Sequence, residues 1–235
     1  MTATPPGDWW LDELAHAGHE HLDEAYVAGY EAKAGYDPAD DLDALRRHGF
    51  GAGSTVVDLG AGTGRFTVDA ARECRAVVAV DVSPPMVAAL RERVDRLGLA
   101  NVTVVQAGFL SYEHAGPPAP YVFSRNALHQ IPDFWKGIAL ARIAGMMESG
   151  GILRLKDLVF DFEPSDAAQR IPEWMDGAVD DPARGWTAAE LAEHVRIEFS
   201  TYSWVFEPML ERVGFEILER DYVRRAYGTY TCRKR

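Results

Sequence analysis

The stretch Val57-Asp58-Leu59-Gly60-Ala61-Gly62-Thr63-Gly64 decides the fold of this chain. It begins in a short β-branched run, 54–59, and passes directly into a glycine loop. Glycines allow a tight turn from a strand into a helix, and they let a ligand approach the backbone N–H groups at the N-terminus of that helix. We therefore expect a strand over 54–59, a ligand-binding loop over 60–64 and a helix over 65–74.

Outward from this loop, short apolar runs alternate with helical patterns. Further strands are expected at 76–80, 102–105, 121–124 and 152–160, with helices after Ser83-Pro84 and after Asp133. This alternation predicts βαβ units with right-handed crossovers and a mostly parallel sheet. The runs 215–223 and 227–232 are expected to form an antiparallel pair at the edge. The predicted fold class is therefore α/β: a Rossmann-like, mostly parallel seven-stranded sheet with helices on both faces.

Composition narrows the range of partners. The 235 residues carry 24 Lys+Arg and 36 Asp+Glu, a net charge of −12, which disfavours broad binding to a nucleic-acid backbone. No run of about 18 apolar residues predicts a membrane span. Residues 1–10 lack a basic region followed by an apolar run, so no secretory signal is expected. The two cysteines form no disulfide framework, and we expect a reducing, cytoplasmic location.

An acidic residue follows the glycine loop at the spacing typical of a residue that binds a ribose. Asp81 ends the second expected strand, 21 residues beyond Gly60, where a carboxylate can accept both hydroxyls of a ribose. A nicotinamide dinucleotide and S-adenosylmethionine both contain such a ribose. The loop reads GxGxG, and Arg65 stands where the dinucleotide pattern GxGxxG requires its third glycine. Asp58 would repel a pyrophosphate but suits the cationic methionine part of S-adenosylmethionine.

With these residues in place, the chain resembles the class I S-adenosylmethionine-dependent methyltransferases. The resemblance covers about 54–160 and includes the later segment Glu148-Ser149-Gly150-Gly151-Ile152-Leu153. It implies a Rossmann-like fold and S-adenosyl-L-methionine as the cofactor. It also implies methyl transfer by in-line displacement. Two alternatives stay open: a nicotinamide-dependent oxidoreductase on the same sheet, and a non-catalytic subunit that binds S-adenosylmethionine.

The resemblance also implies where the cofactor is bound. Gly60 and Gly62 would face its methionine part, with Asp58 near the ammonium group. Asp81 would hold the ribose. The adenine would lie between residues of the segment that follows, Val82 and Met86.

The resemblance defines the remaining contacts to the adenine and to the methionine part less closely. The third strand of the family usually ends in an Asp that binds the adenine amine, but the matching position here is Gly108. Adenine recognition is therefore expected to rest on backbone groups and on apolar contact with Phe109. Asn126, after the fourth strand, is expected at the methionine end. Tyr30, on an N-terminal helix, is expected to reach the methionine carboxylate or to pack in the lid.

Histidines are the candidate catalytic residues. His129 follows the fourth strand, where it is expected either to act as a general base or to support the loop. His194 and Glu198 are one helical turn apart, and they are expected to form either an acid–base pair or an ordinary i,i+4 surface pair. The cluster His16, His19 and His21 lacks the ligand spacing of a metal site, and no metal is expected.

These expectations combine into one enzyme built as a single domain. Residues 1–50 form an N-terminal helical lid, 51–160 the cofactor-binding core, 161–206 a helical insertion on the substrate side, and 207–235 a C-terminal helix with the antiparallel strand pair. The expected acceptor is a small molecule with an oxygen or nitrogen nucleophile, such as a secondary metabolite or a sugar. No nucleic-acid or membrane partner is expected, and a homodimer is a possible assembly.

Overall fold

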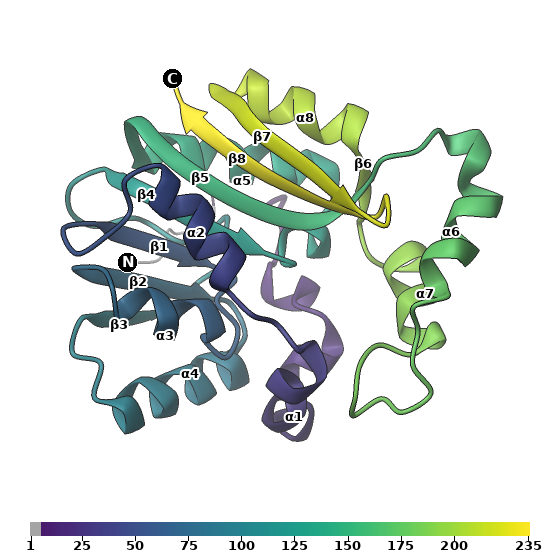
Figure 1. The fold of residues 1–235 in the computed structure, drawn as a ribbon, viewed down its shortest axis with the longest axis horizontal. Coiled ribbons are helices and arrows are strands. Elements are labelled where there is room, and N and C mark those ends of the chain that lie inside the picture. Colours follow the sequence, from purple (N-terminus) through teal and green to yellow (C-terminus); the bar gives the residue numbers. More distant parts are fainter. Residues whose placement is uncertain (1–5) are drawn as a thin grey trace.

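The central sheet runs in the order β3-β2-β1-β4-β5-β8-β7 in the computed structural model of the chain (Figure 1). The structure describes residues 6–235, so residues 1–5 of the predicted lid lie outside the described residues. The strands are β1 (Thr55–Leu59), β2 (Ala76–Asp81), β3 (Val102–Gln106), β4 (Ala119–Arg125), β5 (Met147–Phe160), β7 (Phe215–Val223) and β8 (Tyr227–Lys234). A two-residue strand, β6 (Thr201–Tyr202), pairs with the end of β5.

The pairing confirms the predicted fold class. Strands β1 to β5 pair in parallel, and β8 lies antiparallel between β5 and β7. The run 76–80 is apolar throughout because a parallel strand is covered by helices on both faces. The strand order reverses between β1 and β4, and ligands of such sheets bind in the crevice at the carboxyl ends of the strands at that point. The glycine loop follows β1 there.

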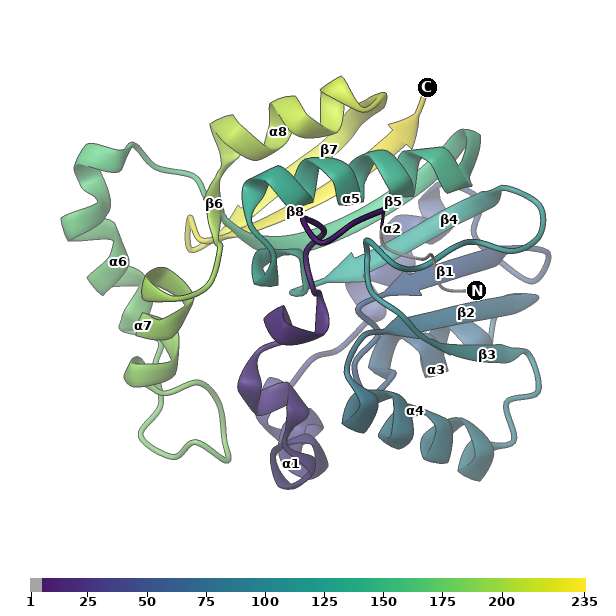
Figure 2. The same ribbon diagram turned by 180° about the vertical axis from the view of Figure 1, so that it is seen from behind.

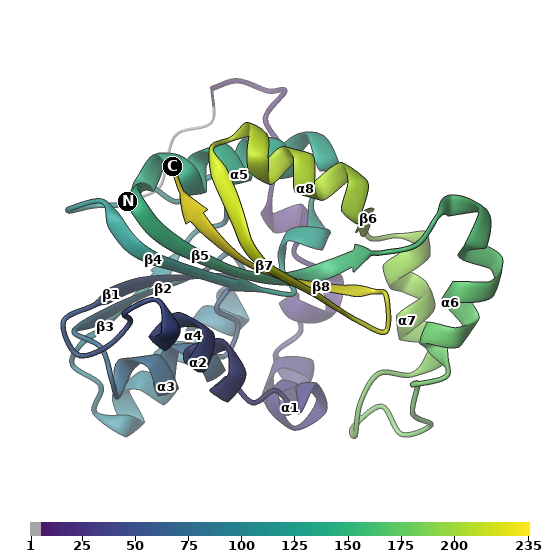
Figure 3. The same ribbon diagram turned by 45° about the horizontal axis from the view of Figure 1, so that its top comes forward.

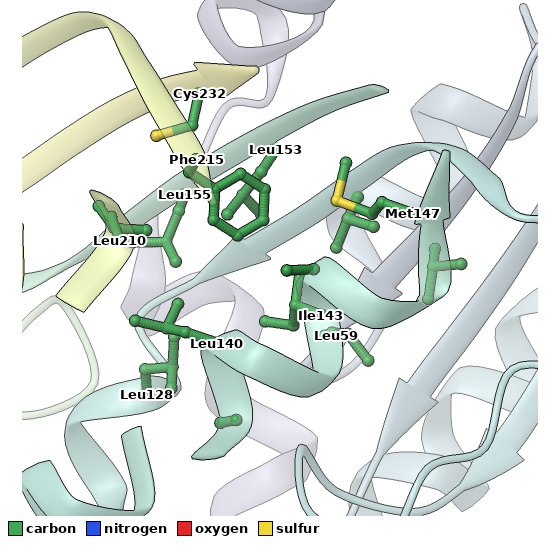
Figure 4. Close-up of a cluster of buried hydrophobic side chains, with 14 of the residues drawn as sticks. Leu59, Leu128, Leu140, Ile143, Met147, Leu153, Leu155, Leu210, Phe215 and Cys232 are labelled. Carbon is green, nitrogen blue, oxygen red and sulfur yellow. The ribbon is translucent and has the colours of Figure 1, made fainter. Parts of the chain in front are cut away.

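Helices cover the two faces of the sheet (Figures 2 and 3). On one face pack α2 (Ala39–Arg47), α3 (Arg65–Ala71) and α4 (Pro84–Leu97), and on the other pack α5 (Asp133–Met146) and α8 (Ser203–Arg212). Figure 4 shows the hydrophobic core between the sheet and the helices α5 and α8. There Leu140 and Ile143 of α5 and Leu210 of α8 meet Leu153 and Leu155 of β5. Burying each such side chain contributes about 1.5–3 kcal/mol, so this core stabilises the sheet whose strand ends carry the loops of the site.

The helical insertion lies beyond the carboxyl end of β5, at one end of the molecule (Figure 1). It contains α6 (Ala167–Met175) and α7 (Ala188–Arg196), preceded by a short turn η4 (Pro164–Asp166). A capping box begins α7: the Thr187 hydroxyl accepts from Glu190 N, and the Glu190 carboxylate accepts from Thr187 N. Trp174 and Leu191 pack against the end of β5 through Leu158 and Phe160.

Helix α8 begins earlier than the sequence pattern indicates. The C-terminal helix was expected within 207–235, but it starts at Ser203, and Pro208 lies inside it. A proline inside a helix removes one backbone hydrogen bond, to the carbonyl four residues earlier. That residue is Trp204, which is 56% exposed, so solvent can reach this side of the helix.

The N-terminal segment consists of two single turns and one helix. These are η1 (Leu14–His16), η2 (His19–Leu22) and α1 (Glu24–Ala34). Both η2 and α1 contact α4, and the Ser83 hydroxyl donates to the His21 carbonyl at 2.6 Å. Lys33 of α1 forms an ion pair with Glu190 of α7. None of the helices in residues 6–235 combines the length and apolar character needed to cross a membrane.

Candidate active site

The glycine loop joins β1 to α3 through backbone conformations that favour glycine. Gly60 and Gly62 have φ angles of +73° and +54°. A Cβ atom at position 60 would lie 2.5 Å from Cβ of Ala127, so no larger residue fits there. At position 62 the nearest neighbours, Tyr30 and Met86, are 3.9 and 4.0 Å away, and the space beyond is a cavity.

One cavity of about 90 Å³, called the main cavity because most of the predicted cofactor contacts line it, lies at the carboxyl ends of β1, β2 and β4. Nine of the ten predicted cofactor-binding residues line it: Tyr30, Gly60, Gly62, Asp81, Val82, Met86, Gly108, Phe109 and Asn126. The N-terminal segment forms another part of the wall, with Glu13, His16, Ala17 and His21. The residues selected from the sequence as cofactor contacts are therefore together in space.

The tenth residue, Asp58, lines a second cavity of about 250 Å³. The two cavities share five residues: Tyr30, Gly60, Gly62, Arg125 and Asn126. They therefore meet at the glycine loop. The wall of the second cavity farther from the loop is aromatic, with Tyr36 and Trp186, and the Arg125 guanidinium lies 3.9 Å from the centre of the Tyr36 ring.

Asp81 ends β2 with its carboxylate already oriented. Oδ2 accepts from Gly62 N at 2.7 Å and Oδ1 accepts from Ser83 N at 2.9 Å. Each carboxylate oxygen has a second lone pair, so the group can accept two further hydrogen bonds from a diol. Burial raises the pKa of Asp81 above its usual range.

Asp58 is almost fully buried, at 1% exposure. Its Oδ2 accepts a hydrogen bond from the Thr67 hydroxyl at 2.5 Å. Burial raises the pKa of Asp58 to about 7, which the bond from Thr67 partly offsets. A buried carboxylate with this pKa is suited to a cationic ligand, because a nearby positive charge stabilises its ionised form.

Asn126 follows β4 in a left-handed conformation, with φ of +48°. Its backbone N–H donates to the Lys156 carbonyl of β5 at 2.8 Å. Its side-chain oxygen is buried and has no hydrogen-bond partner within residues 6–235. Such an orphaned acceptor costs about 1–3 kcal/mol unless a ligand supplies a donor. The amino group of the methionine part of the predicted cofactor is a donor of this kind.

Glu13 occupies the space beside Gly108, where the family's usual Asp is absent. A Cβ atom at position 108 would lie 2.6 Å from Cδ of Glu13. The Glu13 carboxylate accepts from Leu110 N at 2.8 Å and from the Ser111 hydroxyl at 2.9 Å, and it lines the main cavity. Nothing in the sequence pattern marks Glu13, because it lies 97 residues from Leu110.

His129 is 4% exposed, and both of its ring nitrogens have neighbours. Nδ1 lies 2.5 Å from Oδ1 of Asp157 on β5, and Nε2 lies 3.4 Å from Oε2 of Glu198 and 3.1 Å from Nε2 of Gln130. Burial alone would lower the pKa of His129, but the Asp157 carboxylate outweighs it and the pKa is raised. His129 is not among the described residues that line the two cavities. Its role as a general base stays a prediction.

His194 and Glu198 form the predicted pair, and their side chains contact each other directly. Each side chain is only 12% exposed, so this is a largely buried pair and not a solvated surface pair. The pair lies beside His129, whose ring centre is 5.7 Å from that of His194. The sequence spacing did not predict this proximity, since His129 lies 65 residues earlier in the chain.

Comparison with known proteins identifies the core. Residues 56–151 match the family model described as methyltransferase domain. The chain is 28% identical over 191 residues to an uncharacterized methyltransferase from Geobacillus sp. (strain WCH70), covering 81% of this chain and 83% of the relative.

Two solved structures share the fold. Phosphoethanolamine N-methyltransferase 2 from Haemonchus contortus, in complex with S-adenosyl-L-methionine, has a TM-score of 0.71 at 16% identity. That match covers 96% of this chain and 60% of the other. N-methyltransferase NodS from Bradyrhizobium japonicum, in complex with S-adenosyl-L-homocysteine, has a TM-score of 0.59 at 16% identity, covering 83% of this chain and 86% of the other.

The family match and the curated relatives concern methyltransferases, and they favour S-adenosylmethionine over a nicotinamide cofactor. The fold, the glycine loop at the switch point of the sheet and the acidic residue ending β2 agree with them. Residues 56–151 thus match a methyltransferase domain, and the findings together support a class I S-adenosylmethionine-dependent methyltransferase.

Proposed function

We propose that this methyltransferase acts on a nitrogen or oxygen nucleophile of a small molecule. The observation that carries the proposal is the meeting of the two cavities at the glycine loop, through the five residues that they share. One cavity can then hold the adenosine part of the cofactor, and the other its methionine part together with the acceptor. Enclosure by the N-terminal segment and by Trp186 favours an acceptor small enough to enter, and the net charge of −12 disfavours nucleic acid.

The cofactor contacts follow from the cavity walls. Asp81 accepts the ribose hydroxyls, and Val82 with Met86 covers one side of the adenine. Phe109 lies in the same wall. Asp58 and the orphaned oxygen of Asn126 face the methionine end, where a cationic amino group satisfies both. Tyr30 lines both cavities and covers the junction between them.

Glu13 takes the place of the absent Asp at position 108. Its carboxylate lines the main cavity next to Gly108, and each oxygen keeps a lone pair beyond the bonds from Leu110 and Ser111. We propose that it accepts the adenine amine. The N-terminal segment then contributes directly to cofactor recognition.

The chain contributes alignment and exclusion of water to the reaction. S-adenosylmethionine supplies a methyl group already activated by the sulfonium charge. The protein therefore has to hold the acceptor in line and keep water away, and the walls of the two cavities are the parts of the chain that would do so. The aromatic wall of Tyr36 and Trp186 and the Arg125 guanidinium are the groups that would orient the acceptor.

A nitrogen acceptor is the first to test, because the two structural relatives described above are N-methyltransferases by name. The experiment is a methyl-transfer assay with labelled cofactor against panels of small amines and small alcohols, with protein and nucleic acid as separate arms. Transfer to a small molecule is expected. Transfer to protein or nucleic acid alone would overturn the proposal. A cytoplasmic location and a homodimer remain predictions, which fractionation and light scattering test.

A further inference from the structure

Three side chains with metal-ligating atoms meet outside the two cavities. They are His129 in the turn η3 (Leu128–Gln130), His194 on α7 and Glu198 just after α7. One ligand atom from each lies within 4.8 Å of the others. The three side chains are 4%, 12% and 12% exposed. Acidic clusters at a surface are common, but two histidines and a carboxylate gathered away from solvent are not explained by surface charge.

The hydrogen bonds around His129 fix the direction of its free electron pair. Nδ1 lies 2.5 Å from Asp157, so Nδ1 carries the proton and donates it to that carboxylate. In the neutral ring Nε2 then presents a lone pair, 3.4 Å from Oε2 of Glu198. The same Glu198 oxygen contacts Nδ1 of His194. The Gln130 amide is the present neighbour of His129 Nε2 and of Glu198 Oε1, each at 3.1 Å, and a cation among the three ligand atoms would take over this role.

Asp157 behaves as an outer partner of a metal-binding histidine. It accepts backbone hydrogen bonds from Leu128 and from Leu158, each at 2.7 Å, so its carboxylate is held in place independently of His129. A carboxylate that fixes the Nδ1–H of a histidine while Nε2 binds a metal is the usual arrangement around protein metal sites.

We propose that Nε2 of His129, a ring nitrogen of His194 and the carboxylate of Glu198 bind a divalent transition-metal ion of the zinc class. Two histidines and one glutamate form a known zinc ligand set. Magnesium and calcium prefer ligand sets made of oxygen alone. The candidate site is empty in this structure. It does not rest on the proposed acceptor, because its ligands lie outside the walls of the two cavities.

The position of the site indicates what the ion does. His129 follows β4 in the rigid core, while His194 and Glu198 belong to the helical insertion. Gln130, which lines the main cavity, lies 3.1 Å from both His129 Nε2 and Glu198 Oε1. Only the Gln130 side chain therefore separates the candidate metal site from the main cavity. A metal here would clamp the insertion onto the core beside the cofactor.

The competing occupant is a proton. An imidazolium of His129 between the carboxylates of Asp157 and Glu198 would satisfy the same charges without a metal. The two cases differ in one measurement, since only the first leads to specific binding of zinc.

The experiment uses the full chain, treated with a chelator and dialysed. Zinc is titrated by calorimetry, the bound metal is counted by mass spectrometry, and unfolding is followed with and without zinc. The variants are His194→Gln and Glu198→Gln. Their matched controls are His19→Gln, whose side chain is 88% exposed, and Glu193→Gln on the same helix.

We expect one equivalent of zinc in the wild type and in both controls, with a melting temperature that rises on binding. Each ligand variant should bind zinc at least about tenfold more weakly and lose the rise. Cobalt(II) bound to the wild type should show the visible absorption of a low-coordinate site with nitrogen ligands, a readout that does not depend on the folding of any variant. Absence of zinc binding by the wild type would overturn the proposal, as would equal binding by the wild type and both ligand variants.

Discussion

The carboxylate of Glu13 stands where a side chain at position 108 would have to lie: a Cβ atom on Gly108 would be 2.6 Å from Cδ of Glu13. In the proposed function, this acidic group from the N-terminal segment takes the place of the Asp that the family usually has after β3. The hydrogen bonds of Glu13 therefore connect the N-terminal segment to the loop after β3, although the two segments share no helix or strand. This replacement also makes the two positions dependent on each other, which gives a reciprocal test.

Glu13→Ala should weaken binding of S-adenosylhomocysteine by roughly tenfold, since a hydrogen bond to a charged acceptor contributes about 1.5–3 kcal/mol and water partly replaces it. The double variant Glu13→Ala with Gly108→Asp should recover part of this loss. Calorimetry measures both. The contribution of the adenine amine is measured separately with an analogue of S-adenosylhomocysteine in which a carbonyl replaces that amine. If Glu13 only anchors the segment, the variant will lose equal affinity for both ligands.

Asp81→Ala should weaken cofactor binding by about 1–3 kcal/mol, because a charged acceptor of two hydroxyl groups is lost. The comparison variant is Asp95→Ala, an exposed carboxylate on α4. A dissociation constant for Asp81→Ala within twofold of the wild-type value would show that the ribose is held elsewhere.

Cofactor affinity should rise with pH between about 6 and 8, because burial places the pKa of Asp58 at about 7 and only the ionised form attracts the ammonium group. Asp58→Asn should remove this dependence. The measurement is the dissociation constant of S-adenosylhomocysteine across that range. A wild-type profile as flat as that of the variant would contradict the placement of Asp58 near the cation.

Asp58 should make the free energy of unfolding of the unliganded chain fall as the pH rises, which is opposite to its effect on cofactor affinity. Its pKa is raised from 3.8 to about 7 on folding, so the folded state holds the proton more tightly than the unfolded state. The stabilisation is complete below pH 3.8 and is lost as the pH rises through about 7. Urea unfolding should show that Asp58→Asn flattens this part of the pH profile.

Gly62→Val should abolish cofactor binding, because its side chain would project into the cavity between Tyr30 and Met86. Valine at a φ of +54° also strains the backbone, so a control with the same strain is needed. Gly98→Val provides it: Gly98 has a φ of +63°, with no atom within 4 Å of its Cβ position. Both variants should lose similar stability, and only Gly62→Val should lose binding. Retained binding in a folded Gly62→Val chain would show that the loop has only a structural role.

The features that could be predicted from the sequence are those encoded locally. The strand before Gly60, the turn itself and the carboxylate ending β2 lie within one short segment. Their periodicity and spacing therefore predicted the sheet, and the family resemblance that they carry implied nine residues that line the main cavity. The capping box that begins α7 is encoded in the same local way, by Thr187 and Glu190.

What could not be predicted depends on contacts between distant segments. The pairing of Glu13 with Gly108 requires the N-terminal segment to reach the end of β3. The proximity of His129 to His194 requires the insertion to fold back onto β5 through Trp174. Spacing showed only that His194 and Glu198 are one turn apart, so their burial, and the third ligand beside them, follow from tertiary packing.

The position of the N-terminal segment has a kinetic consequence. Residues 13–21 form part of the wall of the main cavity, and they are held by Glu13 at one end and by the bond from Ser83 to His21 at the other. A cofactor that leaves past this segment has to break these few hydrogen bonds first. On that route, the opening of the segment and not the displacement itself would set the rate of successive turnovers.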